Sequence, residues 1–374
     1  MNMNSKAWLA CILTISTSSA FAVDVSVKAG LGIDTNPHRL ASQFSPEEQN
    51  YIFSNVRIKS DSKSALVFDA SMSQWLFQDL TTADSSSYRL FVGYKDKLLD
   101  NKLSYRAGVR YQHSDRTYVS RFSGQVYQTK GQSAEDRYDY SRLTPTLDLR
   151  YRLNKQHYLL FDWEYRVMDY EDYTALGLSN LDYEQWQMSA GWLYRSSKAT
   201  RHEFSGFMRN RVYDDRAAKD LDGKSIVGLN SEYAYQGIEY KLRHQLAEDL
   251  RLSVTASYTS KEDNAQGYYD TNYLSLKADL RHTLSDALSY TVSAAYRDLA
   301  YTREGALTNA DDVNDELPDN QGIHLKLAID GRLASWNEVQ LSYYANANYY
   351  NFDSDTQVYR FDRTKLETGI QLRF

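Results

Sequence analysis

The sequence predicts an all-β fold, a single transmembrane up-and-down antiparallel β-barrel of about 16 strands. Three observations lead to this prediction. Apolar and polar residues alternate with a period of two along most of the chain, which is typical of strands with one apolar face. Tyr is abundant and Pro is scarce, with 32 Tyr and 4 Pro among 374 residues. Beyond the N-terminal leader, no segment shows the 3.6-residue period of an amphipathic helix.

The first 22 residues are typical of a secretory signal peptide. Lys6 gives a positive start, Ala7–Ile15 is a short apolar run, and Ala20–Ala22 is an A-x-A cleavage pattern. The apolar run is too short to cross a bilayer as a helix. Cys11 is the single cysteine and would leave with the leader, so we expect no disulfide in the mature barrel, residues 23–374. A lipoprotein cleavage site ending at Cys11 is the alternative.

The alternation is clearest in Leu103–Tyr111, Leu159–Val167, Leu250–Tyr258, Ile323–Asp330 and Val339–Tyr349. Each segment is long enough to cross a membrane as a tilted strand. The full set of about 16 segments begins near Val23, Tyr51, Ala65, Tyr88, Leu103, Leu143, His157, Gln185, His202, Tyr233, Leu250, Tyr273, Leu288, Ile323, Val339 and Arg363.

Short and long connections alternate between these segments, as expected for short periplasmic turns and long extracellular loops. Pro145 falls inside a predicted strand, and proline cannot donate a ladder hydrogen bond, so we expect a bulge or a strand start there. The expected turns are Asp61–Ser64, Leu153–Gln156, Ala247–Asp249, Leu284–Ala287 and Ala334–Asn337, and the expected loops are Asp34–Asn50, His113–Tyr138, Asp169–Glu184, Asp214–Ser231 and Thr302–Asn320.

The polar face of the predicted strands carries full charges in segment after segment. Large aromatic residues gather near segment ends, at Trp75, Trp163, Trp186, Trp192 and Trp336, as in the aromatic girdles of membrane barrels. A sheet of this size leaves exposed edges unless it closes, and lipid requires every backbone group to be paired. We therefore expect a closed barrel with its apolar face toward lipid and its polar face toward an aqueous lumen.

With these features the chain resembles the Gram-negative outer-membrane β-barrels, a resemblance that covers the whole mature chain. In that family the assembly machinery reads an alternating last strand that ends in an aromatic residue. The resemblance implies that Leu366, Ile370, Leu372 and Phe374 form this assembly signal. It also implies a multi-pass location in the outer membrane, with membrane lipid and the assembly machinery as partners. The stretch Gly30–Pro37 is similar to the first strand of barrels in exopolysaccharide-export and surface-lipoprotein-assembly systems.

The polar face of the barrel is predicted to be basic although the whole chain carries a net charge of −6, because much of the acid lies in the long loops. Rings of Arg and Lys lower the barrier for negative solutes, which indicates an anion path. The alternative is that these residues pair with acids on neighbouring strands and stabilise the wall. The predicted lumen-lining basic residues are Arg57, Arg89, Arg106, Arg110, Arg150, Arg166, Arg209, Arg211, Lys241, Arg251, Lys277, Arg297 and Lys326.

No catalytic, metal or cofactor site is predicted. His113–Asp115 brings His, Ser and Asp together in sequence, but adjacent strand residues point to opposite faces. No two His have metal-ligand spacing, and Asp311–Asn320 lacks the pattern of a calcium loop. No nucleotide fingerprint occurs, and nucleic acid is not an expected partner. We expect a protein that is not an enzyme.

The function predicted from the sequence is passage of hydrophilic, anionic solute or polysaccharide across the outer membrane. Tyr273, Tyr344 and Tyr350 fall on the lumen face, where their rings would suit stacking against sugars. The alternative is a plugged, non-conducting barrel whose loops serve adhesion or surface binding, with His113–Tyr138 as the plug. The sequence leaves homo-oligomerisation open.

Overall fold

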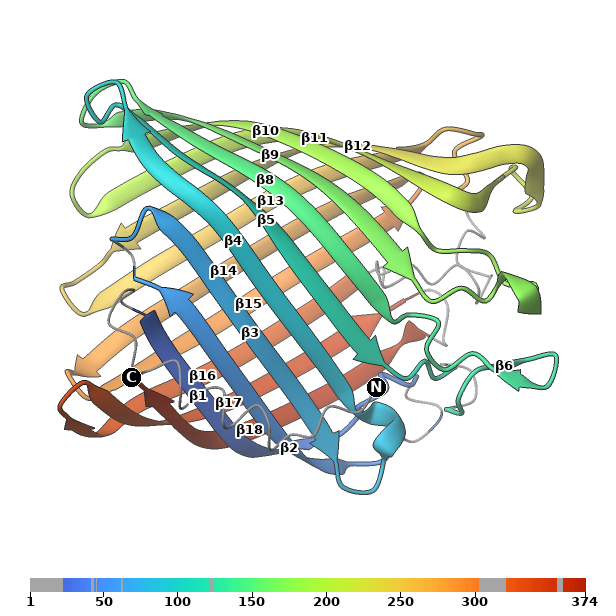
Figure 1. The fold of residues 1–374 in the computed structure, drawn as a ribbon, viewed down its shortest axis with the longest axis horizontal. Helices are drawn as coiled ribbons and strands as arrows, with labels where there is room; N and C mark the ends of the chain where they lie inside the picture. Colours follow the sequence, from blue (N-terminus) through green and yellow to red (C-terminus); the bar gives the residue numbers. More distant parts are fainter. Residues whose placement is uncertain are drawn as a thin grey trace.

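Sixteen long strands form one closed antiparallel barrel (Figure 1). The computed structural model describes residues 23–374 except 42, 43, 45, 62, 121–123, 303–320 and 355–358. The predicted signal peptide and the acidic stretch Asp311–Asn320 lie outside the described residues. The predicted fold class is confirmed, including the number of strands. No helix in the described part of the chain is both long and apolar enough to cross a membrane.

The barrel strands follow the chain in an unbroken meander, apart from a small hairpin inserted after β5. Their bounds are β1 Val23–Asp34, β2 Gln49–Ser60, β3 Leu66–Phe77, β4 Ser85–Leu98, β5 Leu103–Arg116, β8 Tyr140–Arg152, β9 His157–Tyr170, β10 Tyr183–Arg195, β11 Thr200–Lys219, β12 Ser225–Gln245, β13 Leu250–Asp263, β14 Thr271–Ser285, β15 Leu288–Tyr301, β16 Gln321–Trp336, β17 Val339–Asp353 and β18 Phe361–Arg373. The inserted hairpin pairs β6 Gln128–Thr129 with β7 Gln132–Ser133. Two short 3-10 turns lie at Thr81–Ala83 and Thr174–Leu176.

The barrel closes where the first strand meets the last. β1 pairs with β2 on one side and with β18 on the other, with Gly30 opposite Gly369 across the closing seam. Beyond the last strand, Val25 and Phe374 exchange backbone hydrogen bonds of 3.3 and 2.8 Å. Closure removes the two free edges that an open sheet would expose.

The two ends of the barrel differ in their connections. One end, the left side of Figure 1, holds 61–65, 99–102, 153–156, 196–199, 246–249, 286–287 and 337–338 together with the C-terminus; we call it the turn end. The opposite end, which we call the loop end, holds the described residues of the other connections, within 35–48, 78–84, 117–139, 171–182, 220–224, 264–270 and 354–360, and Thr302.

One predicted loop is wrong. Most of Asp214–Ser231 is strand, because β11 and β12 continue past their neighbours and stay paired as far as Lys219 and Ser225. The pairing shifts register between Val212 and Ala217 and again before Lys219. These irregularities disturb the period-two pattern, and a disturbed pattern is difficult to distinguish from a loop in the sequence.

A large apolar surface faces outward. Leu31, Ile52 and Leu325 are 64%, 56% and 47% exposed and occupy alternate positions of their strands. A soluble monomer does not expose a continuous apolar band around its whole circumference. A closed barrel with such a band is the β architecture that can span lipid. The outward apolar band therefore indicates a barrel that spans a membrane with its strands.

Trp75 corrects the predicted aromatic girdle. Its ring packs 5.0 Å from the ring of Phe53, its partner across the β2–β3 pair, and the Nζ of Lys365 lies 5.4 Å from it. Phe53 lines the interior cavity at the turn end, so Trp75 lies on the inner face as well. Trp192 and Trp336 are exposed on the outside, at 41% and 48%.

Pro145 does not form the expected bulge. It pairs with Val109 on β5, and the β8–β9 ladder keeps one register from Leu143 opposite Val167 to Thr146 opposite Glu164. Pro145, which has no N–H, therefore lies in a short gap in the pairing between β8 and β9. The pairing continues in the same register on the other side of the gap.

Two glycines of β1 make room for aromatic rings on the inner wall. A Cβ at Gly32 would lie 2.2 Å from Cζ of Tyr51, and a Cβ at Gly30 would lie 2.3 Å from the hydroxyl oxygen of Tyr344. Both tyrosines are 2% exposed and lie flat against this wall. The glycine pair near the start of the barrel is thus explained by the close packing of these two rings.

Candidate functional site in the barrel lumen

The strand register defines which side chains share the inner face. Arg57 lines the turn-end cavity, and cross-strand partners carry the same face around the wall from Arg57 to Ser71, Arg89, Gln112 and Arg142 in turn. Applied around the barrel, this register places all the predicted basic residues on the inner face: Arg57, Arg89, Arg106, Arg110, Arg150, Arg166, Arg209, Arg211, Lys241, Arg251, Lys277, Arg297 and Lys326.

Some of these residues form ion pairs along the wall. The pairs are Arg57–Asp69 at 2.5 Å, Arg166–Glu164 at 3.0 Å, Lys241–Glu239 at 2.5 Å and Lys277–Asp279 at 3.0 Å. The side chains are partly exposed, so each pair contributes little to stability. Wall pairing, the alternative to an anion path, therefore applies to these four positions.

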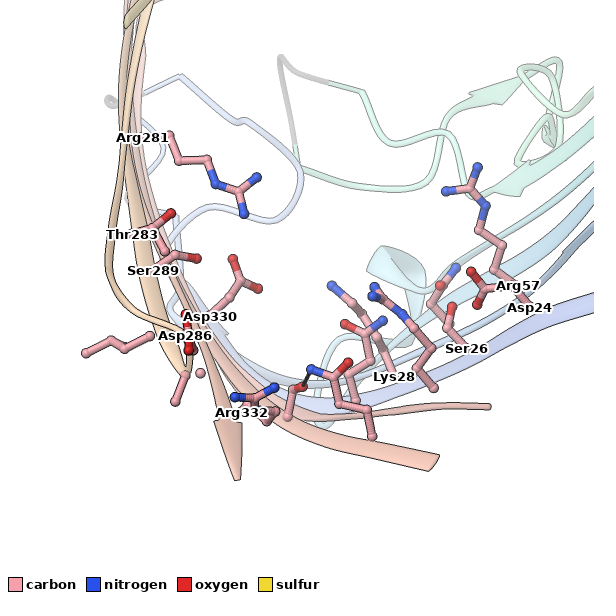
Figure 2. Close-up of a pocket in the computed structure, with 18 of the residues that line it drawn as sticks. Asp24, Ser26, Lys28, Arg57, Arg281, Thr283, Asp286, Ser289, Asp330 and Arg332 are labelled. Atoms are coloured by element: carbon pink, nitrogen blue, oxygen red, sulfur yellow. Dashed lines mark hydrogen bonds between the residues drawn. The ribbon is translucent and has the colours of Figure 1, made fainter. Parts of the chain in front are cut away.

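A cavity of about 690 Å³ opens on one side of the turn end, between β1–β2 and β14–β18. Figure 2 shows Lys28, Arg57 and Arg281 extending from the curved wall into the enclosed space. Basic and acidic groups are mixed here, and we call this cavity the paired pocket. Its charged lining is Lys28, Arg57, Lys59, Arg281, Arg332 and Arg373 with Asp24, Asp286, Asp330 and Glu367.

A second cavity of about 800 Å³ opens at the same end, against β10–β13 and their turns. In the part of the chain that the structure describes, no acidic residue lines it. Its charged lining is Lys155, Arg195, Lys198, Arg201, Arg243 and Arg251, with Gln156, Ser197, Ala199, Thr200 and Gln245 between them. We call this cavity the basic pocket.

Tyrosines cover the inner wall near the loop end. This tyrosine cluster consists of Tyr138, Tyr170, Tyr183, Tyr213, Tyr233, Tyr235, Tyr268 and Tyr269, each 8% exposed or less. Basic groups lie over its rings: Arg211 Cζ is 4.4 Å from the centroid of Tyr183, and Lys261 Nζ is 5.0 Å from that of Tyr233. Arg211 also donates from Nε to Oε1 of Gln185 at 3.1 Å. Such contacts hold cations against the wall.

Loop residues bury this cluster. Tyr138 belongs to the 117–139 connection, and Tyr268 and Tyr269 belong to the 264–270 connection. Tyr118, from the same connection as Tyr138, packs against the cluster with its ring 4.5 Å from that of Tyr138. An inner wall facing open water would not be so fully buried, so these two connections fold over the wall and narrow the lumen from this side.

The three lumen tyrosines predicted to suit sugar stacking are in different situations. Tyr344 is buried, with Lys28 Nζ 4.8 Å from its ring. Tyr350 is stacked on His324, with ring centroids 4.1 Å apart. Tyr273 lies on the inner face opposite Thr259. The sequence missed the tyrosine cluster, although five of its members occupy the loop-end inner positions of β9, β10, β11 and β12.

The residues of the predicted assembly signal lie along the closing seam. Leu366, Ile370 and Phe374 face outward and are 46%, 49% and 49% exposed. Leu372 is on the same face, opposite Val27 of β1. These side chains would contact lipid in the assembled barrel.

The remaining candidate chemistry does not assemble into a site. His113 places Nδ1 3.3 Å from Oγ of Ser141 and its ring 6.2 Å from that of Tyr88, on the opposite face of β5 from Ser114. Among the described residues, no group of three or more His, Cys, Asp or Glu could hold a metal ion.

No protein-family model and no curated protein matches the chain. Solved structures similar to it include OccAB1 from Acinetobacter baumannii, with a TM-score of 0.48, 10% identity, and coverage of 96% of this chain and 98% of that one. An anion-selective porin from Comamonas acidovorans has a TM-score of 0.44 at 11% identity, covering 96% and 100%. A bacterial polysaccharide outer-membrane secretin has a TM-score of 0.43 at 10% identity, covering 96% and 99%.

Proposed function

We propose that this barrel is a non-enzymatic channel that passes hydrophilic anions across the outer membrane. The observation that carries the proposal is the charge of the inner face, where predicted basic residues occur on most strands and the basic pocket has no acidic lining residue. Basic side chains on a pore wall lower the electrostatic barrier for anions and raise their local concentration.

Two partly exposed tyrosines of the inner face support an anionic saccharide as the substrate class, either as a small solute or as a polymer. Tyr273 and Tyr350 are half-buried and lie on the inner face. Tyrosine rings on a pore wall suit sugars, because the ring faces stack while the hydroxyls donate and accept hydrogen bonds. The tyrosine cluster does not supply this surface, because its rings are buried.

A non-conducting barrel with surface-binding loops is the second candidate. The observation that favours it is the burial of Tyr138 and Ala134, at 6% and 0% exposed, within the 117–139 connection. A connection that packs this firmly at the loop end would close the lumen if it also met the opposite wall.

We also propose that Leu366, Ile370, Leu372 and Phe374 act as the signal for the barrel-assembly machinery, and that the loop end faces the cell exterior. Their outward position along the last strand supports this role, because outward side chains are accessible to another protein. A Phe374→Ala variant that reached the membrane at the normal level would count against the signal.

The deciding experiment is single-channel recording of the refolded protein in a planar bilayer under a potassium chloride gradient. We expect steady conductance with a reversal potential that favours chloride. A reversal potential favouring potassium would overturn the proposed anion path. Absence of conductance from correctly folded protein would favour the second candidate.

A further inference from the structure

Three arginines lie side by side in the basic pocket. Arg195 on β10 is directly opposite Arg201 on β11, and Arg201 is directly opposite Arg243 on β12. Neighbouring strands are about 4.8 Å apart, so three positive charges occupy adjacent positions on one face. Like charges placed directly opposite each other destabilise a sheet. A wall that only needed stability would not select this arrangement.

Little neutralises these charges within the protein. Arg201 donates from Nη2 to Oε2 of Glu203 at 2.9 Å, but Glu203 is shared with Lys241, whose Nζ lies 3.7 Å from Oε1. Lys241 pairs more closely with Glu239, at 2.5 Å, so Glu203 mainly serves Arg201. Arg195 and Arg243 have no carboxylate partner among the described residues.

A fourth arginine increases the repulsion. Arg150 and Arg195 place their Cζ atoms 4.4 and 4.9 Å from the centroid of the same Tyr158 ring. The ring face attracts both guanidinium groups, but it carries no net charge to cancel theirs. Lys155 and Lys198, from the 153–156 and 196–199 turns, and Arg251 from β13 complete the lining.

We propose that the basic pocket is a binding site for a multivalent oxyanion, a ligand that carries several phosphate or carboxylate groups. Arg presents a planar fork of N–H donors that matches the oxygen pairs of both groups. A ligand with several such groups can bridge the arginine row and relieve its repulsion, which a single chloride ion cannot do. The inference rests on the proposed channel function and deepens it, because it names the ligand class and a place in the barrel where the ligand binds.

The first test is isothermal titration of the refolded protein in detergent with tripolyphosphate, citrate and acetate at constant ionic strength. We expect saturable binding of tripolyphosphate or citrate and none of acetate. The variant Arg195→Gln/Arg243→Gln should weaken binding at least about tenfold, since it removes two charged hydrogen-bonding groups. The tripolyphosphate and citrate arms distinguish a phosphate-bearing from a carboxylate-bearing ligand.

The paired pocket supplies the matched control. Arg57→Gln/Lys59→Gln removes the same charge from the same end of the barrel, but from residues that already face Asp69 and Asp24. This variant should bind within about twofold of the unaltered protein, because only a small electrostatic contribution is lost. Equal losses in the two variants, or no binding to the unaltered protein, would overturn the proposed site. If the glutamine variant misfolds, Arg195→Lys/Arg243→Lys keeps the positive charge but removes the paired N–H donors of the guanidinium groups. Weaker binding by this variant would then show that those donors contact the ligand.

The second test is block of chloride current by tripolyphosphate added on one side of the bilayer. Block that the Arg195→Gln/Arg243→Gln variant relieves, and that the control variant keeps, supports the site within the conducting path. Chloride-selective current with no oxyanion binding would overturn the proposed binding site and support the proposed channel. Binding that depends on Arg195 and Arg243 in a protein that does not conduct would support the binding site and overturn the proposed channel.

Discussion

The paired pocket and the basic pocket lie at the same end of one barrel and use their charges differently. Each is lined by six basic residues, but the paired pocket adds four acids and the basic pocket adds none. In the paired pocket Arg57 and Lys59 contact Asp69 and Asp24 at 2.5 and 3.0 Å. The difference shows that similar composition can serve two purposes: charges that meet within the wall stabilise it, and charges that do not meet remain available to a ligand.

The closing seam holds a buried ion pair, whereas the other ion pairs of the wall are partly exposed. β1 and β18 come from opposite ends of the chain, so their contact carries the largest loop-closure cost in the barrel. Arg363 of β18 donates from Nε to Oδ1 and Oδ2 of Asp34 of β1 at 2.9 and 3.1 Å, and also from Nη2 to Oδ2. Asp34 is 0% exposed. A buried charge that loses its partner is costly, so this pair should matter more to stability than the partly exposed pairs elsewhere on the wall.

The largest expected effect comes from breaking this pair. Arg363→Leu should lower the free energy of unfolding by about 3–5 kcal/mol, because it leaves the buried Asp34 carboxylate without its partner. Guanidinium unfolding from lipid vesicles measures the change. The control is Arg57→Leu, whose partner Asp69 is 30% exposed, with an expected loss of about 0–1 kcal/mol. Equal losses would show that the seam pair is not special.

The second effect tests the packing of the same wall. In Gly32→Ala the new Cβ would meet the Tyr51 ring at 2.2 Å and the backbone oxygen of Leu366 at 2.5 Å. We expect destabilisation of about 1–3 kcal/mol from overpacking. Gly206 of β11 is the control, because its nearest atom beyond its chain neighbours, the backbone oxygen of Gly237, is 3.7 Å from the ideal Cβ. Gly206→Ala should be neutral or stabilising, and a comparable loss there would contradict the packing argument.

The third effect is a pH dependence of the free energy of unfolding, which we expect from His38 in the 35–48 connection at the loop end. Burial, and then the positive charge of Arg363, lower the pKa of His38 from 6.5 to about 4, although Asp34 opposes them. His38 shares a 3.0 Å hydrogen bond with Thr82 Oγ1. The unfolded chain takes up a proton below about pH 6.5 and the folded chain only near pH 4, so this contribution is complete at higher pH and is lost as pH falls between these values.

Between pH 7 and pH 5 the loss should reach about 1–2 kcal/mol. Unfolding measured at both pH values checks it, with His38→Gln as the control that keeps a hydrogen-bonding side chain but cannot titrate. The difference between the two pH values should shrink by this amount in the control. An unchanged difference would show that His38 is not the group responsible.

The sequence alone predicted the barrel, because period-two alternation depends only on local order. A cross-strand pair such as Arg57–Asp69 depends on register, and register is a property of two strands. The other three wall pairs join residues two apart on one strand, so their closeness can be read from the sequence. Arg201 was missed, since the strand was expected to begin at His202 rather than Thr200. Trp75 lies near a strand end, which suggests a lipid-facing aromatic girdle. It is six residues from Asp69, however, and an even separation on a strand puts both side chains on the same, inner face. The tyrosine cluster needed the folded path of two connections, which alternation does not contain.

The smallest effect separates the two pockets most directly. Arg243→Gln should raise the free energy of unfolding by about 0.2–1 kcal/mol at low salt, because it removes one of two like charges placed opposite each other on β11 and β12. Arg57→Gln, in the paired pocket, should have the opposite sign, since it removes a charge that faces Asp69. Salt screens both effects, so repeating the measurement at about 1 M salt should bring the two variants together. If Arg243→Gln were destabilising at low salt, the arginine row would be part of what holds the wall, and the distinction between structural and available charge at this end of the barrel would fail.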